Sequence, residues 1–319
     1  MTNVTSTALS TGGAWPREGK KDMKQIISAA VTPFTEEGKL DLDSAARLYQ
    51  HGLKQRLDGF FIMGSMGEWA LLAPDERDRL AETACSVIGK KAKILLGISD
   101  TGMPSILHNM EKWGHLGHSH WTVIPPGNWA GPGDPVKYLH GLADRADRPL
   151  YFYYLPSFNG VNITMAQFRD ILAHPKIAGV KNSSGSLRVR KELLSIKKDQ
   201  PFELYEGEEW AIDESLFLGC DGAVAGFAST AGKLMKRLAA GIDAGDFIAA
   251  AKIQAHLLEL FYAVYGEQVT WWTAGQKYAL QYLGIITSGV TRVAAQQAMP
   301  ESQRAVIRAC VDKNREHLV

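Results

Sequence analysis

Apolar segments alternate eight times with segments of helical periodicity over about 220 residues, and this alternation constrains the fold more than any other feature. Strands that alternate with helices indicate a parallel sheet covered by helices, and eight units of this total length are typical of a closed (β/α)8 barrel, or TIM barrel. An open doubly wound sheet is the alternative. No apolar segment is followed by Gly-x-Gly-x-x-Gly, which disfavours the dinucleotide-binding version of that sheet. The eight apolar segments are Ile26–Phe34, Gly59–Met63, Lys93–Ser99, Trp121–Ile124, Leu150–Leu155, Ile177–Lys181, Phe202–Tyr205 and Ala223–Ala228.

The pattern changes after the eighth unit, where helical segments follow one another without intervening strands. Phe247–Tyr265, Trp271–Leu283 and Glu301–Leu318 predict a C-terminal helical appendage. The first residues are rich in Ser, Thr and Gly and lack the apolar region of a secretory signal. We therefore expect a flexible extension over residues 1–23, a barrel over 24–240 and a helical segment packed on the barrel over 241–319.

Charge and cysteine content restrict the partners and the compartment. The net charge of +1 gives no electrostatic reason to expect nucleic acid or a charged membrane surface. No apolar run reaches the roughly 20 residues that span a bilayer. Cys85, Cys220 and Cys310 are odd in number and far apart, which favours a reducing compartment over a disulfide framework. We expect a cytoplasmic protein without nucleic-acid or membrane partners.

The segment Ile177–Lys181 ends abruptly on a lysine, and small polar residues and Gly185 follow. A lysine is almost never fully buried without a partner, so we place Lys181 where the strand leaves the core. Desolvation disfavours the ammonium form, and an amine held between apolar walls is then available as a nucleophile. Taken alone, the segment fits a strand-ending lysine that points to water at least as well.

Two other strand ends carry residue types that suit a site. The loop Gly64–Gly67 offers backbone N–H groups ahead of a helix, which suits a carboxylate or phosphate, although a tight turn that needs glycine explains it as well. Tyr153 shares one strand face with Tyr151 and Leu155. A tyrosine beside an amine can move protons, but core packing is the commoner role of a strand tyrosine.

Clusters of histidine and tryptophan favour structural roles. His115, His118 and His120 precede the fourth strand, at the end of a barrel opposite to its chemistry. We expect them in a surface loop rather than around a metal. Trp271 and Trp272 begin a helix, and we expect them to serve packing or a subunit contact rather than a cofactor.

Four segments, taken together and in order, resemble the dihydrodipicolinate synthase / N-acetylneuraminate lyase family of class I, Schiff-base-forming, pyruvate-type aldolases. Gly64–Glu68 matches G-[ST]-x-G-E, Tyr153–Pro156 matches Y-x-x-P, Gly179–Ser184 matches G-[VIL]-K-[DN]-[ST]-S, and Lys277–Leu280 matches K-x-A-L. The resemblance covers about residues 24–310. It implies a small-molecule α-keto acid substrate, no metal or organic cofactor, and a homotetramer built as a dimer of dimers.

The resemblance also implies a role for each matched residue. Lys181 forms a Schiff base with the ketone of an α-keto acid, and Tyr153 moves protons to and from substrate oxygen. Ser65 relays a proton with Tyr153, and it holds the substrate carboxylate together with the backbone from Gly64 to Gly67. The remaining substrate-binding positions are Met66, Gly207, Glu209, Val224, through its backbone carbonyl, and Phe158.

Departures from the family pattern narrow the substrate. Gly127 stands where dihydrodipicolinate synthases have a tyrosine that crosses the dimer, and Phe158 stands where they have an arginine for a distal carboxylate. Trp210 and Gly226 replace an acid and a serine of the sialic-acid lyases, and Met66 replaces a second hydroxyl residue. These departures argue against both lysine biosynthesis and sialic acid.

We therefore expect a Schiff-base lyase that cleaves or condenses a 2-keto-3-deoxy sugar acid or a related pyruvate aldol. The alternatives, in order, are dehydration of such an acid, 4-hydroxy-tetrahydrodipicolinate synthesis and a non-catalytic keto-acid-binding barrel. The side chains predicted at the edge of the pocket could accommodate either a shorter sugar acid or an aromatic aldehyde, and the sequence does not decide between these two substrates. That edge comprises Trp69, Trp129, Phe158, Phe227 and Glu209.

Overall fold

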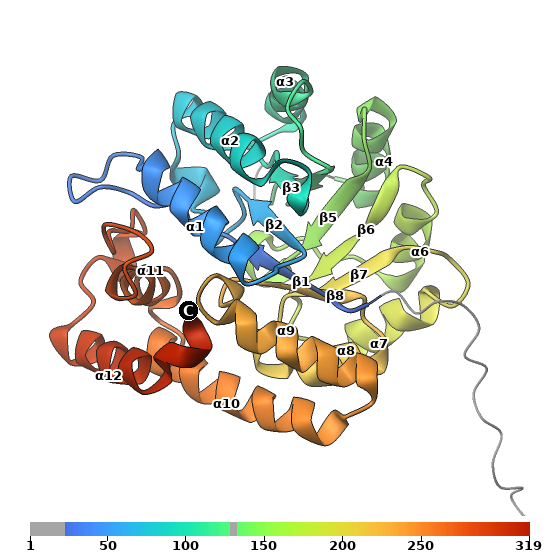
Figure 1. Ribbon diagram of the computed structural model, residues 1–319. Helices are drawn as coiled ribbons and strands as arrows, with labels where there is room; N and C mark the ends of the chain where they lie inside the picture. The colour runs from blue at the N-terminus through green and yellow to red at the C-terminus, as the bar shows by residue number, and fades with distance from the viewer. Residues whose placement is uncertain (1–22, 128–132) are drawn as a thin grey trace, which may run out of the picture.

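A closed barrel of eight parallel strands forms the centre of the computed structural model, which describes residues 23–127 and 133–319 (Figure 1). Each strand pairs with the next in the chain, and the eighth pairs with the first. The predicted (β/α)8 barrel with C-terminal helices is confirmed. The strands are β1 (Gln25–Ala29), β2 (Gly59–Ile62), β3 (Lys93–Gly97), β4 (His120–Val123), β5 (Leu150–Tyr154), β6 (Ile177–Asn182), β7 (Glu203–Glu206) and β8 (Gly222–Ala225).

The helices of the described residues surround the barrel and continue beyond it. Residues 1–22 of the predicted extension lie outside the described residues. The α-helices are α1 (Leu42–Lys54), α2 (Pro74–Ile88), α3 (Met103–Trp113), α4 (Pro135–Arg145), α5 (Pro156–Asn159), α6 (Met165–Leu172), α7 (Leu187–Ile196), α8 (Ile212–Leu218), α9 (Ala228–Ala244), α10 (Phe247–Tyr265), α11 (Trp272–Tyr282) and α12 (Glu301–Leu318).

Short-range side-chain contacts determine where several of these helices begin. Asp41 caps α1 by accepting a hydrogen bond of 2.9 Å from the Ser44 N–H. Thr164 and Gln167 cap α6 reciprocally, each side chain accepting from the other residue's backbone N–H. Helix α2 begins at Pro74, whose fixed φ suits the first helical position.

Strand β5 shows how the strands divide their side chains between two cores. Tyr151 and Tyr153 belong to the cluster inside the barrel. Phe152 and Tyr154 point outward, where their rings lie 5.9 and 5.1 Å from that of Phe168 on α6. The predicted alternation along this strand is confirmed.

A register shift between β5 and β6 brings two side chains together. Leu150 pairs with Ile177, but Tyr151 pairs with Gly179, so one extra residue of β6 is accommodated at Ala178. Tyr153 consequently lies opposite Lys181 instead of Val180. Such bulges re-aim side chains and are common near active sites.

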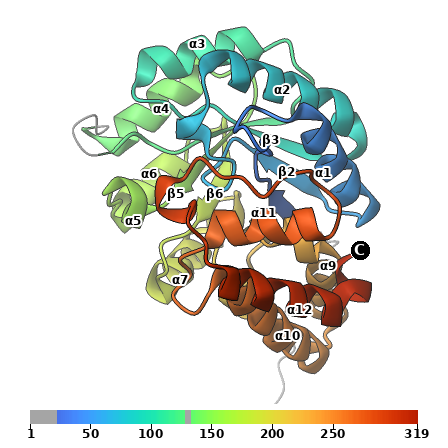
Figure 2. The ribbon, with the colours of Figure 1, turned by 90° about the vertical axis from the view of Figure 1, so that its left-hand side faces the viewer.

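Helices α10, α11 and α12 form a layer beside the barrel and pack on one another and on α9 (Figure 2). The boundary expected at residue 240 falls inside α9.

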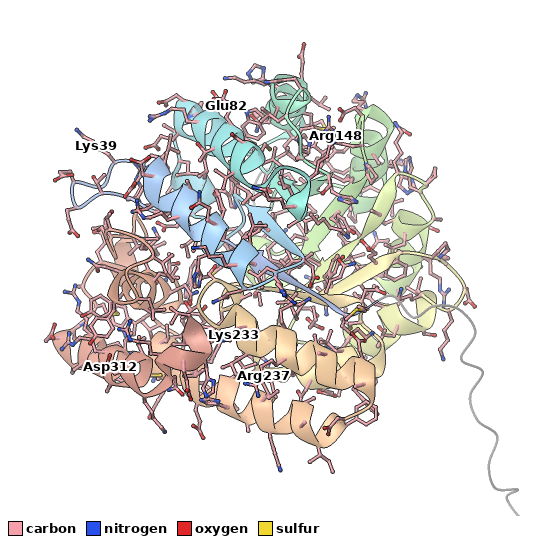
Figure 3. All side chains as sticks on the ribbon, viewed as in Figure 1. Lys39, Glu82, Arg148, Lys233, Arg237 and Asp312 are labelled. Atoms are coloured by element: carbon pink, nitrogen blue, oxygen red, sulfur yellow. The ribbon has the colours of Figure 1, made fainter. Side chains whose placement is uncertain are left out.

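By length and composition alone, α10 is the one helix of the described residues that can cross a membrane. Its neighbours α9, α11 and α12 cover part of it, as in the helices of a globular protein. Charged residues such as Lys39, Glu82 and Asp312 lie at the periphery (Figure 3).

Candidate active site

A cavity of about 450 Å³ opens where the strands end at their carboxyl termini, the end that carries the active site in TIM barrels. Most of the residues expected from the sequence to bind or transform a substrate line it. The lining comprises Ala29, Ser65, Met66, Tyr153, Leu155, Ser157, Phe158, Lys181, Gly207, Glu209, Trp210, Val224, Gly226, Phe261, Tyr265, Val269 and Trp272.

Lys181 lies at the floor of this cavity and does not point to bulk water. It is 6% exposed, and its Nζ lies 3.9 Å from the centre of the Tyr153 ring and 5.3 Å from that of Phe61. Both rings belong to the core inside the barrel. The predicted placement of Lys181 between apolar walls is confirmed, and the reading as a water-exposed strand end is wrong.

Gly207 brings the end of β7 against the stem of Lys181. A Cβ atom at this position would lie 2.0 Å from Ser183 Oγ and 3.0 Å from Lys181 Cε. The backbone N–H of Gly207 donates a hydrogen bond of 2.8 Å to the Asn182 carbonyl oxygen. Only glycine permits this close approach of backbone to the lysine.

The loop after β2 places Ser65 in the cavity. Its buried hydroxyl has no hydrogen-bond partner among the described residues, so a bound substrate can supply one. Gly64 and Gly67 shape the loop but do not line the cavity. A Cβ at Gly64 would meet the Phe61 ring at 2.7 Å. Close packing against the Phe61 ring, rather than a left-handed backbone conformation, accounts for Gly64, and Ser65 and Met66 are the loop residues that line the cavity.

A buried ion pair holds this loop to the C-terminal layer. Glu68 adopts a left-handed backbone conformation, with φ of 54°, and its carboxylate pairs with Lys277 of α11. Neither side chain is exposed. The second carboxylate oxygen accepts from the Thr291 hydroxyl at 3.0 Å and from the Arg292 N–H at 2.7 Å. Burial lowers the pKa of Lys277 to about 8, while Glu68 opposes that shift.

Three glutamates follow Tyr205, but only Glu209 faces the cavity. Its carboxylate accepts a 2.8 Å hydrogen bond from the Phe227 N–H. Burial raises its pKa to about 7, against the opposing effects of that N–H and of the Lys181 charge. Glu206 is buried in an ion pair of 2.5 Å with Arg190, and Glu208 accepts from the Gly185 N–H.

The outer wall of the cavity contains residues that sequence reasoning did not place there. Phe261, Tyr265 and Trp272 come from α10 and α11. The spacing of Phe261 and Tyr265 fits any helix face that packs on a core, so it gave no signal of a ligand. Trp272 packs against the hydrophobic core, as expected for it, and in addition lines the cavity.

Several other expectations about side chains need correction. Trp69 and Phe227 do not line the cavity; Phe227 is buried 5.6 Å, ring to ring, from Tyr265. Trp129, also expected at the pocket edge, lies outside the described residues.

His118 is buried against Trp121, with ring centres 4.0 Å apart, so the expected surface loop is wrong for it. In residues 23–127 and 133–319, no cluster of three His, Cys, Asp or Glu side chains could hold a metal ion.

Comparisons with known proteins match almost the whole chain. The family model described as the dihydrodipicolinate synthetase family matches residues 22–311. A 4-hydroxy-tetrahydrodipicolinate synthase of Kineococcus radiotolerans is 28% identical over 285 residues, covering 88% of this chain and 90% of the relative. The dihydrodipicolinate synthase structure from Bacteroides thetaiotaomicron superposes with a TM-score of 0.84 at 23% identity, covering 92% of this chain and all of that one. A prophage protein of the dihydrodipicolinic acid synthase family from Escherichia coli K12, solved with pyruvate, gives a TM-score of 0.82 at 24% identity, covering 92% and 98% of the two chains.

Proposed function

Because this chain belongs to the dihydrodipicolinate synthetase family and is a Schiff-base, pyruvate-dependent aldolase or lyase, we propose that it cleaves and forms pyruvate aldols at Lys181. The observation that supports this proposal most strongly is the position of the Lys181 amine, which is buried between two aromatic rings and lines the cavity. The pyruvate bound in the similar Escherichia coli protein supports the choice of the α-keto acid.

The proposed reaction begins when the Lys181 amine adds to the substrate ketone and water leaves, which gives an iminium ion. The C3–C4 bond then breaks, its electron pair enters the iminium system, and the C4 hydroxyl loses its proton as an aldehyde forms. Tyr153, which lines the cavity, can accept that proton while its own phenol proton passes to solvent, and the unpartnered Ser65 hydroxyl can bind the substrate carboxylate. Protonation of the enamine at C3 and addition of water release pyruvate and free the lysine.

Dehydration of a 2-keto-3-deoxy acid, the first alternative, shares the first intermediate and requires the same Lys181. The names of the curated relatives favour 4-hydroxy-tetrahydrodipicolinate synthesis instead. Two observations speak against it. Lys181 is the only Lys, Arg or His among the described cavity-lining residues, so a distal carboxylate lacks a cationic partner. A Cβ at Gly127 would lie 1.9 Å from the Asn159 carbonyl oxygen, which excludes a tyrosine there without movement of α5.

Borohydride trapping tests this proposal. The protein is incubated with pyruvate, reduced and digested, and the added mass is located by mass spectrometry. We expect the adduct on Lys181, no adduct in Lys181→Ala, and full labelling of Lys191→Ala, which removes an exposed lysine of α7. Turnover in Lys181→Ala should fall on the order of 10⁴-fold or more. Tight reversible binding of α-keto acids without any adduct would support the non-catalytic binding barrel instead.

The compartment and the assembly complete the proposal. We infer a cytoplasmic location from the three scattered cysteines and the near-neutral charge. A homotetramer built as two dimers is expected, although one similar solved structure is described as a monomeric dihydrodipicolinate synthase variant. Sedimentation velocity, paired with activity measured on the same samples, distinguishes the two states. Because Gly127 has no side chain to offer a partner, we expect activity to depend little on assembly.

A further inference from the structure

The two halves of the cavity differ in chemical character. The floor presents the amine of Lys181, the ring of Tyr153 and the hydroxyl of Ser65. The outer half is walled mainly by apolar and aromatic side chains, which are Met66, Leu155, Phe158, Trp210, Phe261, Tyr265, Val269 and Trp272. Pyruvate needs only the floor, so this outer half must receive the remainder of the substrate.

Three aromatic side chains of the outer wall, Trp210, Phe261 and Tyr265, form a packed cluster. The Trp210 and Phe261 rings meet edge to face with centres 6.0 Å apart, and Phe261 and Tyr265 meet in the same way at 4.7 Å. Phe158 and Trp210 nevertheless stay 55% and 48% exposed. Large aromatic side chains that line a cavity and remain half open to water are suited to contact with a flat apolar group.

Polar groups are scarce in this half of the cavity. Among its described lining residues, Ser157, Glu209, Tyr265 and Trp272 carry polar side-chain atoms. The Tyr265 hydroxyl already donates to Gln276 Oε1 at 3.3 Å, and Glu209, which accepts one backbone N–H, is left to bind one or two substrate hydroxyl groups. A chain with several hydroxyl groups would therefore leave some of them unpaired, which costs binding free energy.

Met66 and Gly226 fill a position where a polar contact would otherwise fit. A Cβ at Gly226 would lie 2.8–3.0 Å from the Cγ, Cε and Sδ atoms of Met66. The absence of a side chain at 226 is thus what gives the thioether its place. The two residues together present an apolar surface where a serine and a hydroxyl residue would present two polar groups.

We propose that the aldehyde half of the substrate is a flat, apolar aryl group, an inference that rests on the proposed function. The substrate class is then the 4-aryl-4-hydroxy-2-oxobutanoates, and the products are pyruvate and an aryl aldehyde. A polyhydroxylated keto acid is the poorer substrate. The bonds formed and broken are those of the aldol reaction above, so no oxidant, reductant or further co-reactant is required.

A panel of aldehydes tests the inference separately from the proposed function. Purified enzyme is supplied with pyruvate and either benzaldehyde or glyceraldehyde, and pyruvate consumption and aldol formation are followed in parallel with borohydride trapping. We expect the pyruvate adduct on Lys181 and about a 100-fold higher kcat/KM for benzaldehyde. An adduct combined with equal or higher kcat/KM for glyceraldehyde overturns the aryl inference and leaves the proposed function standing. No adduct overturns both.

Variants of the wall show whether the preference arises there. Trp210→Ala removes a half-exposed ring from the cavity, and Phe217→Ala removes a 57% exposed ring that does not line it. We expect Trp210→Ala to lower kcat/KM for benzaldehyde about 10-fold while glyceraldehyde changes little, and Phe217→Ala to match the wild type. Equal losses for both aldehydes in Trp210→Ala would contradict an aryl contact at this wall.

Discussion

The floor and the outer wall of the cavity are built from different parts of the chain. Strand ends hold the floor, where backbone pairing places Tyr153 opposite Lys181. Connecting segments and C-terminal helices hold the wall, to which they contribute Phe158, Trp210 and Trp272. The floor agrees with the family pattern and the wall departs from it. Under the proposed function, the barrel supplies the shared Schiff-base chemistry, whereas the loops and C-terminal helices select the aldehyde with which the enamine reacts.

The largest expected effect tests whether the wall is an integral part of the fold. Lys277→Met removes the partner of a fully buried carboxylate, which typically costs about 3–5 kcal/mol in free energy of unfolding. Denaturant unfolding followed by circular dichroism measures it. The double variant Glu68→Met/Lys277→Met should recover much of the loss, since no charge then stays unpaired. A single variant as stable as the wild type would show that α11 docks without this pair.

A pair of tyrosines compares floor and wall directly. Tyr153→Phe removes the hydroxyl from the ring that lies against Lys181, and we expect kcat to fall about 10²- to 10³-fold because a proton-transfer group is lost. Tyr265→Phe removes a hydroxyl from the wall and should lower kcat only a few-fold. Steady-state kinetics with separate kcat and KM values check both. Equal losses of kcat in the two variants would contradict the proposal that the floor carries out the chemistry and the wall does not.

A smaller effect concerns Glu209, the carboxyl group that borders both regions. Its pKa is raised from 4.5 to about 7 by burial, so the folded state favours the protonated form. The stability this group contributes is complete below pH about 4.5 and is lost as pH rises through 7. Glu209→Gln should therefore be more stable than the wild type at pH 8, by about 2 kcal/mol, but not at pH 4. Denaturant midpoints at both pH values decide this, and a gain independent of pH would contradict it.

The barrel and most of the floor followed from the sequence because their signals are local. Apolar runs alternating with helical segments define the strand order, and strand ends at Lys181 and Tyr153 identify one edge of the barrel. The shift at Ala178 that sets Tyr153 opposite Lys181 is invisible in the sequence, since pairing register depends on the neighbouring strand. An aromatic helix face looks the same whether it packs on a core or borders a cavity, which is why Phe261 and Trp272 were not predicted.

Exchange of the pyruvate methyl protons with deuterium shows whether the chemistry of the floor is independent of the wall, because exchange requires no aldehyde. Enzyme and pyruvate are mixed in D₂O, and the C3 methyl signal is followed by NMR in the wild type and in the double variant Phe158→Ala/Trp210→Ala. We expect equal exchange rates in the two proteins, within about two-fold, together with a reduced preference for benzaldehyde over glyceraldehyde in the variant. An exchange rate that falls together with the aldehyde reaction would contradict the separation of chemistry from selectivity.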